Sequence, residues 1–192
     1  MKTEDLINEL SQQSSKCEYQ SPKKLFGYWA LFFILYCSLI FVIFDLREDI
    51  DSKIQEFTFT CEMLLAIITA VSAAYLSFLL AIPDQERKRY YNYLPIIPLI
   101  LMGIIIISSG TIDSQSLQKS LKDDHFIITL MLICYAILPV IVIYYYVKKL
   151  APTLPALNGF MIILSATATS HFIIRMTKMA DNLAPVIVWC YF

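Results

Sequence analysis

The chain has 192 residues and a net charge of −1, with 58% hydrophobic and only 16% charged residues. An ordinary soluble domain is about half apolar and roughly a quarter charged, so a water-soluble globule of this size is nearly excluded. The near-neutral charge and the lack of a long basic run exclude a nucleic-acid-binding chain, and the high hydrophobic content excludes a disordered one. The composition therefore indicates a small protein that crosses a membrane several times.

The first 24 residues contain no apolar core, so they are not a cleavable signal peptide. We expect residues 1–24 to form a tail outside the membrane, with a short amphipathic helix near its start. Thr3 would cap this helix, and Leu6, Ile7 and Leu10 would share one face. A helix of about ten residues is marginal alone in water, so this face must pack on something. The bundle itself, the lipid surface and a partner's groove are all open, and the mixed charges of the tail slightly favour a partner.

Apolar blocks follow the tail, most of them close to the roughly 20 residues that a membrane-crossing helix needs. We predict five complete transmembrane helices and a short or truncated sixth. Their approximate ranges are 25–44, 61–82, 94–110, 126–147, 157–176 and 183–192. The last block would rise only ~15 Å as a helix, and we favour truncation because Trp189 and Tyr191 are typical of interfacial aromatics at the start of a buried helix.

The predicted fold is therefore an all-α integral membrane bundle over residues 25–192, preceded by the cytoplasmic tail helix. The loops indicate its orientation. Nine Lys and Arg residues lie in the tail and in the second and fourth loops, against six on the other side. Acidic residues gather in the opposite loops. Because positive charge favours the cytoplasmic side, we place the N-terminus in the cytoplasm.

Charged side chains inside a bilayer are costly and usually mark transport paths. Here Glu62 stands at a helix entrance, while His171 and Arg175 are four residues apart and share one helix face. We interpret His171 and Arg175 as interfacial side chains that extend toward water or pack in the ordinary way. The lack of Asp, Glu or Lys in the middle of the apolar blocks argues against an ion-coupled transporter or a proton pump.

Enzyme motifs are absent: there is no HExxH, no GxSxG and no glycine-rich phosphate loop. We expect no catalytic residue, no metal site and no cofactor. The cysteines stand singly, so neither a zinc site nor a disulfide framework is indicated. Asp123, Asp124 and His125 could bind a divalent metal weakly, but we interpret them as solvated loop charge. Taken alone, Cys134 is interpreted as a small, inert, buried residue.

Four stretches resemble one bacterial family, the six-helix membrane anti-sigma proteins typified by the negative regulator of sigma F. The most specific is residues 151–159, APTLPALNG, which closely resembles the family's inner-loop sequence APTRPALAG. The other three are the acidic-then-aliphatic residues 1–7, the loop 45–50, and Cys134 with the downstream Pro139. Together these stretches span nearly the whole chain.

The resemblance implies a multi-pass protein of the bacterial inner membrane that holds an extracytoplasmic-function sigma factor through its N-terminal segment. An envelope or periplasmic stress signal would release the sigma factor. By position, the residues in contact with the sigma factor would be Asp5, Leu6, Ile7 and Leu10. The partners would be this sigma factor and the lipid bilayer, without direct contact with nucleic acid.

The resemblance also gives Cys134 a second interpretation, as a match to one of two cysteines implicated in sensing in the family. The stretch 175–182, where the family carries its second cysteine, has none here.

Two other functions remain open from the residues alone. A small polytopic channel, carrier or accessory subunit unrelated to transcription would need a polar path through the bundle. A membrane enzyme would need acidic and histidine side chains to converge at one interface, and the candidates are Asp123, Asp124, His125, His171 and Arg175. The inducing signal and the oligomeric state do not follow from the sequence.

Overall fold

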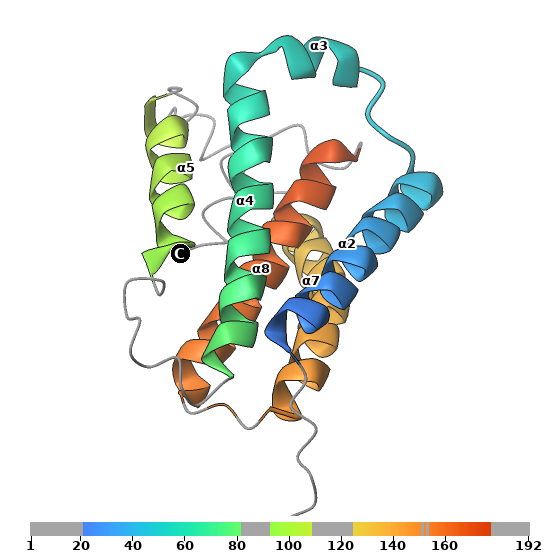
Figure 1. Ribbon diagram of the computed structural model, residues 1–192. Coiled ribbons are helices and arrows are strands. Elements are labelled where there is room, and N and C mark those ends of the chain that lie inside the picture. The colour runs from blue at the N-terminus through green and yellow to red at the C-terminus, as the bar shows by residue number, and fades with distance from the viewer. Residues whose placement is uncertain (1–20, 82–92, 109–124, 151, 153, 178–192) are drawn as a thin grey trace, which may run out of the picture.

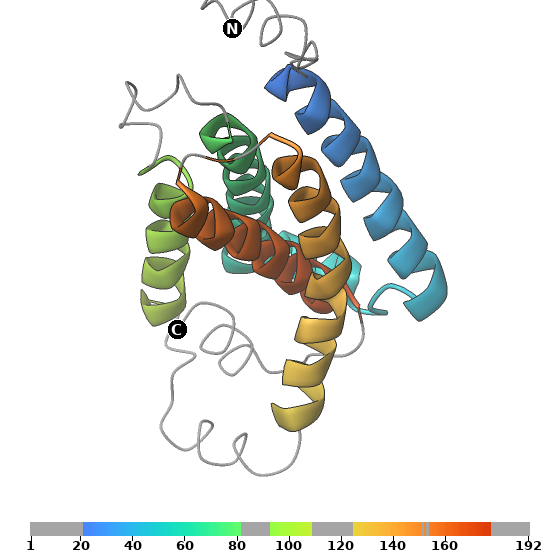
Figure 2. The same ribbon diagram turned by 90° about the horizontal axis from the view of Figure 1, so that it is seen from below.

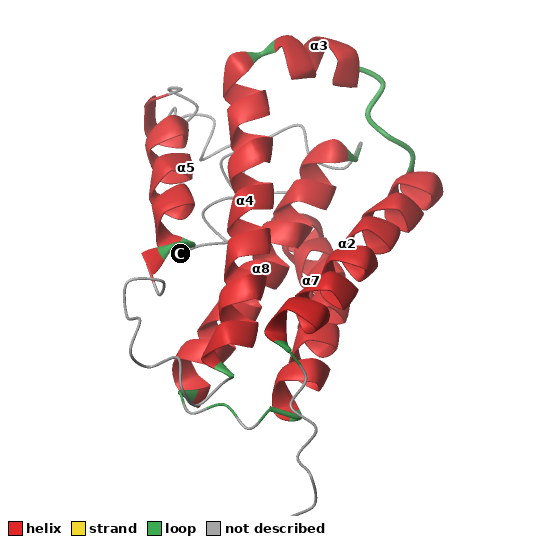
Figure 3. Ribbon diagram, viewed as in Figure 1, coloured by secondary structure: helices red, strands yellow, loops and turns green. Residues whose placement is uncertain are grey.

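The computed structural model describes residues 21–81, 93–108, 125–150, 152 and 154–177. Every helix or strand assigned within these ranges is a helix (Figure 3). The helices are α2 (Pro22–Phe44), α3 (Ile50–Gln55), α4 (Phe57–Leu80), α5 (Ile96–Ser108), α7 (His125–Lys148) and α8 (Pro155–Met176). The all-α prediction is thus confirmed for this part of the chain.

Four of the described helices are long and apolar enough to cross a membrane, namely α2, α4, α8 and the Leu130–Lys148 part of α7. Helix α5 is also apolar, but its 13 residues rise only ~20 Å, less than a hydrocarbon core. Each of the first five predicted apolar blocks overlaps one of these five helices, but among the described residues four of the helices, rather than the five predicted, are long enough to cross a membrane. The predicted sixth block, 183–192, and the tail helix lie outside the described residues.

Local sequence explains where α2 begins and ends. Pro22 occupies the first turn, where its fixed φ suits a helix and its missing N–H is not needed. The helix ends at Asp45, whose φ of 50° is unusual for a residue other than glycine. This turn directs the chain away from the axis of α2 and toward the end of α8.

Helix α3 and the early start of α4 were not predicted. Helix α3 has only six residues, and it shows no clear apolar period because four of them are polar: Asp51, Ser52, Lys53 and Gln55. Helix α4 begins at Phe57, four residues before the predicted block. The apolar pattern did not indicate these four residues because Thr58 and Thr60 interrupt it. The Thr60 hydroxyl donates to the carbonyl of Ile54 at 2.6 Å and so links the two helices.

Helix α8 lies at the centre of the bundle and packs most extensively against α4 and α7. Helix α5 packs on α4, and α2 lies on the other flank of the bundle (Figure 2). Helix α3 lies across one end, where α2 ends, α4 begins and α8 ends (Figure 1). We call this the α3 end. The opposite end carries the starts of α2 and α8 and the last turns of α4 and α7.

Small side chains fill the seam between α4 and α8. The alanines that are almost completely buried on these two helices are Ala66, Ala70, Ala73, Ala74, Ala166 and Ala168. Small residues let two helices approach closely inside a membrane. Interhelical hydrogen bonds accompany this approach: Ser165 Oγ donates to the carbonyl of Ala70 at 2.9 Å, and Asn158 Nδ2 donates to the carbonyl of Ser77 at 3.0 Å.

We expect Ala70→Leu to destabilise this seam. Ala70 is 1% exposed and its carbonyl accepts the Ser165 hydrogen bond, so three extra carbon atoms must push α8 away. Overpacking of this kind costs about 1–3 kcal/mol. The measurement is the free energy of unfolding in mixed micelles titrated with SDS. Ala156→Leu, at an exposed position of α8, is the control and should keep the original value. Equal stability of the two variants would show that the seam has room.

Candidate functional site

A buried charge cluster joins α4 to α8 at the α3 end. Glu62 lies in the second turn of α4, and His171 and Arg175 lie one turn apart near the end of α8. Arg175 donates from Nε to Glu62 Oε1 and from Nη2 to Glu62 Oε2, both at 3.1 Å. His171 Nε2 lies 2.9 Å from Glu62 Oε1. Because an ionised carboxylate only accepts hydrogen bonds, His171 donates here from Nε2.

The three side chains are almost completely removed from solvent. Glu62 and Arg175 are each 3% exposed and His171 is 0% exposed. The guanidinium of Arg175 also lies over the ring of Phe59, 5.2 Å from its centroid. A buried charge without a partner is very costly, so these groups must neutralise one another. The bidentate contact of the Arg175 guanidinium with both carboxylate oxygens of Glu62 is the most favourable geometry for this neutralisation.

The loop after α2 closes over the same end of α8. Leu46 and Thr177 form an antiparallel bridge, and Arg47 N donates to the carbonyl of Met176 at 3.2 Å. The side chain of Arg47 is buried and binds both carboxylate oxygens of Asp49, at 2.8 and 2.9 Å. This hydrogen bonding by Arg47 lowers the pKa of the Asp49 carboxyl, so the pair stays ionised at pH values where an ordinary aspartate takes up a proton.

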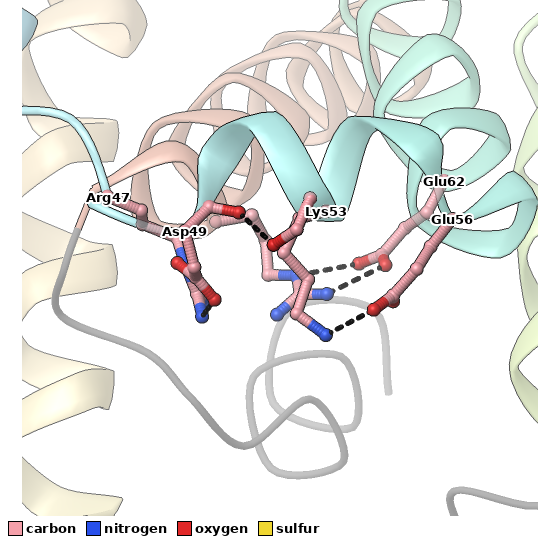
Figure 4. A network of polar contacts seen from close by, with 7 residues as sticks. Arg47, Asp49, Lys53, Glu56 and Glu62 are labelled. Carbon is pink, nitrogen blue, oxygen red and sulfur yellow. Dashed lines mark hydrogen bonds and ion pairs between the residues drawn. The ribbon is translucent and has the colours of Figure 1, made fainter.

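Figure 4 shows the α3 end from close by, with the Arg47–Asp49 pair on the loop and Glu62 at the start of α4. A second pair, Lys53 and Glu56, lies beside them with Nζ and Oε1 2.7 Å apart. This second pair is much more exposed than the Glu62 cluster. The two glutamates therefore lie six residues apart in very different surroundings, which makes Glu56 a natural control for Glu62.

The interpretation of His171 and Arg175 as side chains that extend toward water was wrong. Their spacing correctly placed them on one face of a helix, but that face turns inward onto Glu62, which lies 109 residues from His171. One signal in the sequence could have shown this. Glu62, Ala66 and Ala70 are spaced four apart, so Glu62 belongs to the same inward stripe as the small residues of α4.

Cys134, the other candidate residue that the structure describes, is not part of this cluster. Cys134 lies on an exposed face of α7, rather than in the buried position that we expected, whereas Cys37 of α2 is buried. Asp123, Asp124 and the side chain of His125 lie outside what the structure describes. The described residues contain no group of three or more side chains suited to hold a metal ion.

The predicted sigma-contacting residues Asp5, Leu6, Ile7 and Leu10 also lie outside the described residues, so their role stays a prediction. The chain that carries them joins α2 at Ser21, at the opposite end from the charge cluster.

A family model described as negative regulator of sigma F (NrsF) matches residues 10–192. The chain belongs to the NrsF family. The sequence resemblance noted on residues 151–159 is thereby confirmed over nearly the whole chain. No curated protein and no solved structure matched it.

Membership of the NrsF family implies negative regulation of a sigma factor, and it makes the chain a regulator rather than an enzyme. A sigma factor is therefore its implied partner. The match favours this function over that of a channel, carrier or accessory subunit. It begins at Leu10, so Asp5, Leu6 and Ile7 precede the matched range.

Proposed function

We propose that this NrsF-family chain is a membrane-embedded anti-sigma factor of the bacterial inner membrane. It holds an extracytoplasmic-function sigma factor through its N-terminal helix and releases it on an envelope stress signal. The observation that carries this proposal is the family match over residues 10–192, joined to a bundle whose described helices include four candidate membrane spans.

The described charges support a cytoplasmic tail. Lys23 and Lys24 stand at the start of α2, and Lys148 and Lys149 at the end of α7, so these lysines belong to the opposite end of the bundle. Acidic residues, by contrast, gather in the chain that leads from α2 to α4: Asp45, Glu48, Asp49, Asp51 and Glu56. The positive-inside rule favours the cytoplasmic side for the lysine-rich end, and this supports a cytoplasmic tail.

Sequestration follows from the chemistry of the tail. A short helix that is marginal alone gains order when Leu6, Ile7 and Leu10 bury their apolar face on the sigma factor. The bound sigma factor is then kept at the membrane, away from RNA polymerase. A signal at the α3 end need only change the binding free energy by about 3 kcal/mol to shift affinity more than a hundredfold.

The experiment that tests the proposal changes Leu6 and Leu10 to Asp in the full chain. The chain is purified from host membranes, and extracytoplasmic-function sigma factors that accompany it are quantified by mass spectrometry. We expect the unaltered chain to retain one such sigma factor and the variant to lose it, because two charges would have to be buried in the interface.

Gln12→Asp/Gln13→Asp is the matched control, since it adds the same charges to the polar part of the tail. It should retain the sigma factor, and immunoblots should show equal amounts of all three proteins in the membrane. Retention by the Leu6→Asp/Leu10→Asp variant would show that the tail helix does not hold the sigma factor.

A further inference from the structure

Helix α2 connects the tail to the rest of the protein, and it is held differently from the central helices. A smaller share of α2 is buried than of α4 or α8. Some of its contacts with the bundle are between aromatic rings: Phe26 meets Tyr75 of α4 and Phe41 meets Phe172 of α8, both edge to face. The hydroxyl of Tyr36 adds a hydrogen bond to the carbonyl of Tyr135 at 3.0 Å. Because less of α2 is buried against the bundle, a tilt of α2 removes less packed surface than a tilt of α4 or α8 would.

The α3 end of α2 is tied to α8 through the backbone. After the turn at Asp45, Leu46 runs antiparallel to Thr177. Thr177 itself stays attached to the last turn of α8, because its N–H donates to the carbonyl of Ile173 at 3.1 Å and its hydroxyl to that of Ile174 at 3.2 Å. The end of α2 therefore follows the last turn of α8.

The last turn of α8 is fixed in turn by the charge cluster. Arg175 lies two residues before Thr177 and is anchored to α4 by both oxygens of Glu62. If Glu62 lost its charge, the buried guanidinium of Arg175 would have to reach water or an anion elsewhere. It can do so only if the last turn of α8 moves outward, and Thr177 would then leave Leu46.

From these contacts we infer that the Glu62–His171–Arg175 cluster and the Leu46–Thr177 bridge together form a latch that holds α2 against α8. Opening the latch frees α2 to tilt, and a rigid helix of 23 residues, about 34 Å long, carries that tilt to the tail at its other end. The inference rests on the proposed anti-sigma function for its outcome: an open latch lowers retention of the sigma factor.

The state of the latch can be measured directly by cross-linking. The hydrogen bond from Arg47 N to the carbonyl of Met176 makes Leu46 and Thr177 a non-hydrogen-bonded antiparallel pair, whose Cα atoms lie about 4.5 Å apart. That separation suits a disulfide. Leu46→Cys/Thr177→Cys is made in the full chain with its five natural cysteines replaced by serine. Oxidation should link most molecules, as counted by free thiols labelled with a maleimide reagent.

Glu62→Gln is then added to the cysteine pair. We expect loss of most of the cross-linked form, because the amide cannot neutralise Arg175. Glu56→Gln, which changes the exposed glutamate at the same end, should leave cross-linking unchanged. An equal yield of cross-link in the Glu62→Gln and Glu56→Gln proteins would overturn the inference.

The second readout is the sigma factor retained by membranes from the same cells. Glu62→Gln should release it. In the chain that combines Glu62→Gln with Leu46→Cys/Thr177→Cys, the small fraction of molecules that does become cross-linked should retain it, and dithiothreitol should abolish this retention. A chain that had merely failed to fold would not be rescued by the disulfide. Release that persists after the cross-link has formed would overturn the inference.

Failure of the proposed function gives a different pattern. If the Leu6→Asp/Leu10→Asp chain retains as much sigma factor as the unaltered chain, the tail helix is not the binding element. The cross-linking yields need no sigma factor, so they decide whether the latch exists in either case.

Discussion

Replacing Arg175 by methionine is expected to lower the free energy of unfolding by about 3–5 kcal/mol. The substitution leaves the carboxylate of Glu62, 3% exposed, with His171 in place of the two-pronged contact that Arg175 makes. Breaking a buried pair by removal of one partner is costly because the other charge stays buried. The measurement is SDS-induced unfolding of the purified chain in mixed micelles.

Two controls separate this effect from the general loss of a charged side chain. Lys53→Met removes a cation from the exposed pair with Glu56, and exposed pairs contribute only about 0–1 kcal/mol. Glu62→Leu/Arg175→Met removes both buried charges and should be clearly more stable than Arg175→Met alone. A double variant as unstable as the single one would show that lost packing, rather than an unpaired charge, causes the damage.

Trp29→Ala is expected to cost about 3–5 kcal/mol, a comparable loss at the opposite part of the bundle. Trp29 is 1% exposed and stacks between Phe26 and Phe33, with ring centroids 5.8 and 5.4 Å away. Its removal leaves a cavity that α2 can fill only by moving. Leu31→Ala, at an exposed position of the same helix, should leave the unfolding free energy within about 0.5 kcal/mol of the original.

Trp29→Phe makes the prediction sharper. Trp29 Nε1 is buried without a hydrogen-bond partner in the part of the chain that the structure describes, and an unsatisfied buried donor costs about 1–3 kcal/mol. Phenylalanine keeps a ring between Phe26 and Phe33 but removes this donor. We therefore expect Trp29→Phe to lie close to the original protein in stability. A loss equal to that of Trp29→Ala would contradict this account.

The long helices could be predicted from the sequence because membrane-crossing segments are set by length and apolarity alone. The apolar run 25–44 lies in α2, and 157–176 lies in α8, with bounds within three residues. Helix α3 could not be predicted in the same way. Its six residues form a helix because the chain must cross from the end of α2 to the start of α4, and that is a constraint of the tertiary fold.

The candidate site was only half visible in the sequence. Helical spacing placed His171 and Arg175 on one face, since that relation is local. Their pairing with Glu62 depends on how α4 and α8 pack. A single glutamate at the start of an apolar block does not indicate which residue, more than a hundred positions later, lies beside it. The sigma-factor connection came from the motif in residues 151–159, because no physical property of those residues encodes the partner.

The seam between α4 and α8 limits how this molecule can move. Polar contacts connect α4 and α8 at three levels along their length: Glu62 with Arg175, Ala70 with Ser165, and Ser77 with Asn158. A piston stroke of α8 along α4 would break all three at once, and no second set of partners one turn away is evident among the described contacts. Away from the last turn of α8, where the latch lies, the two helices therefore form a fixed pair. A conformational change that is transmitted across the membrane therefore has to involve a change in the tilt of the helices beside this pair, rather than sliding of α8 along α4.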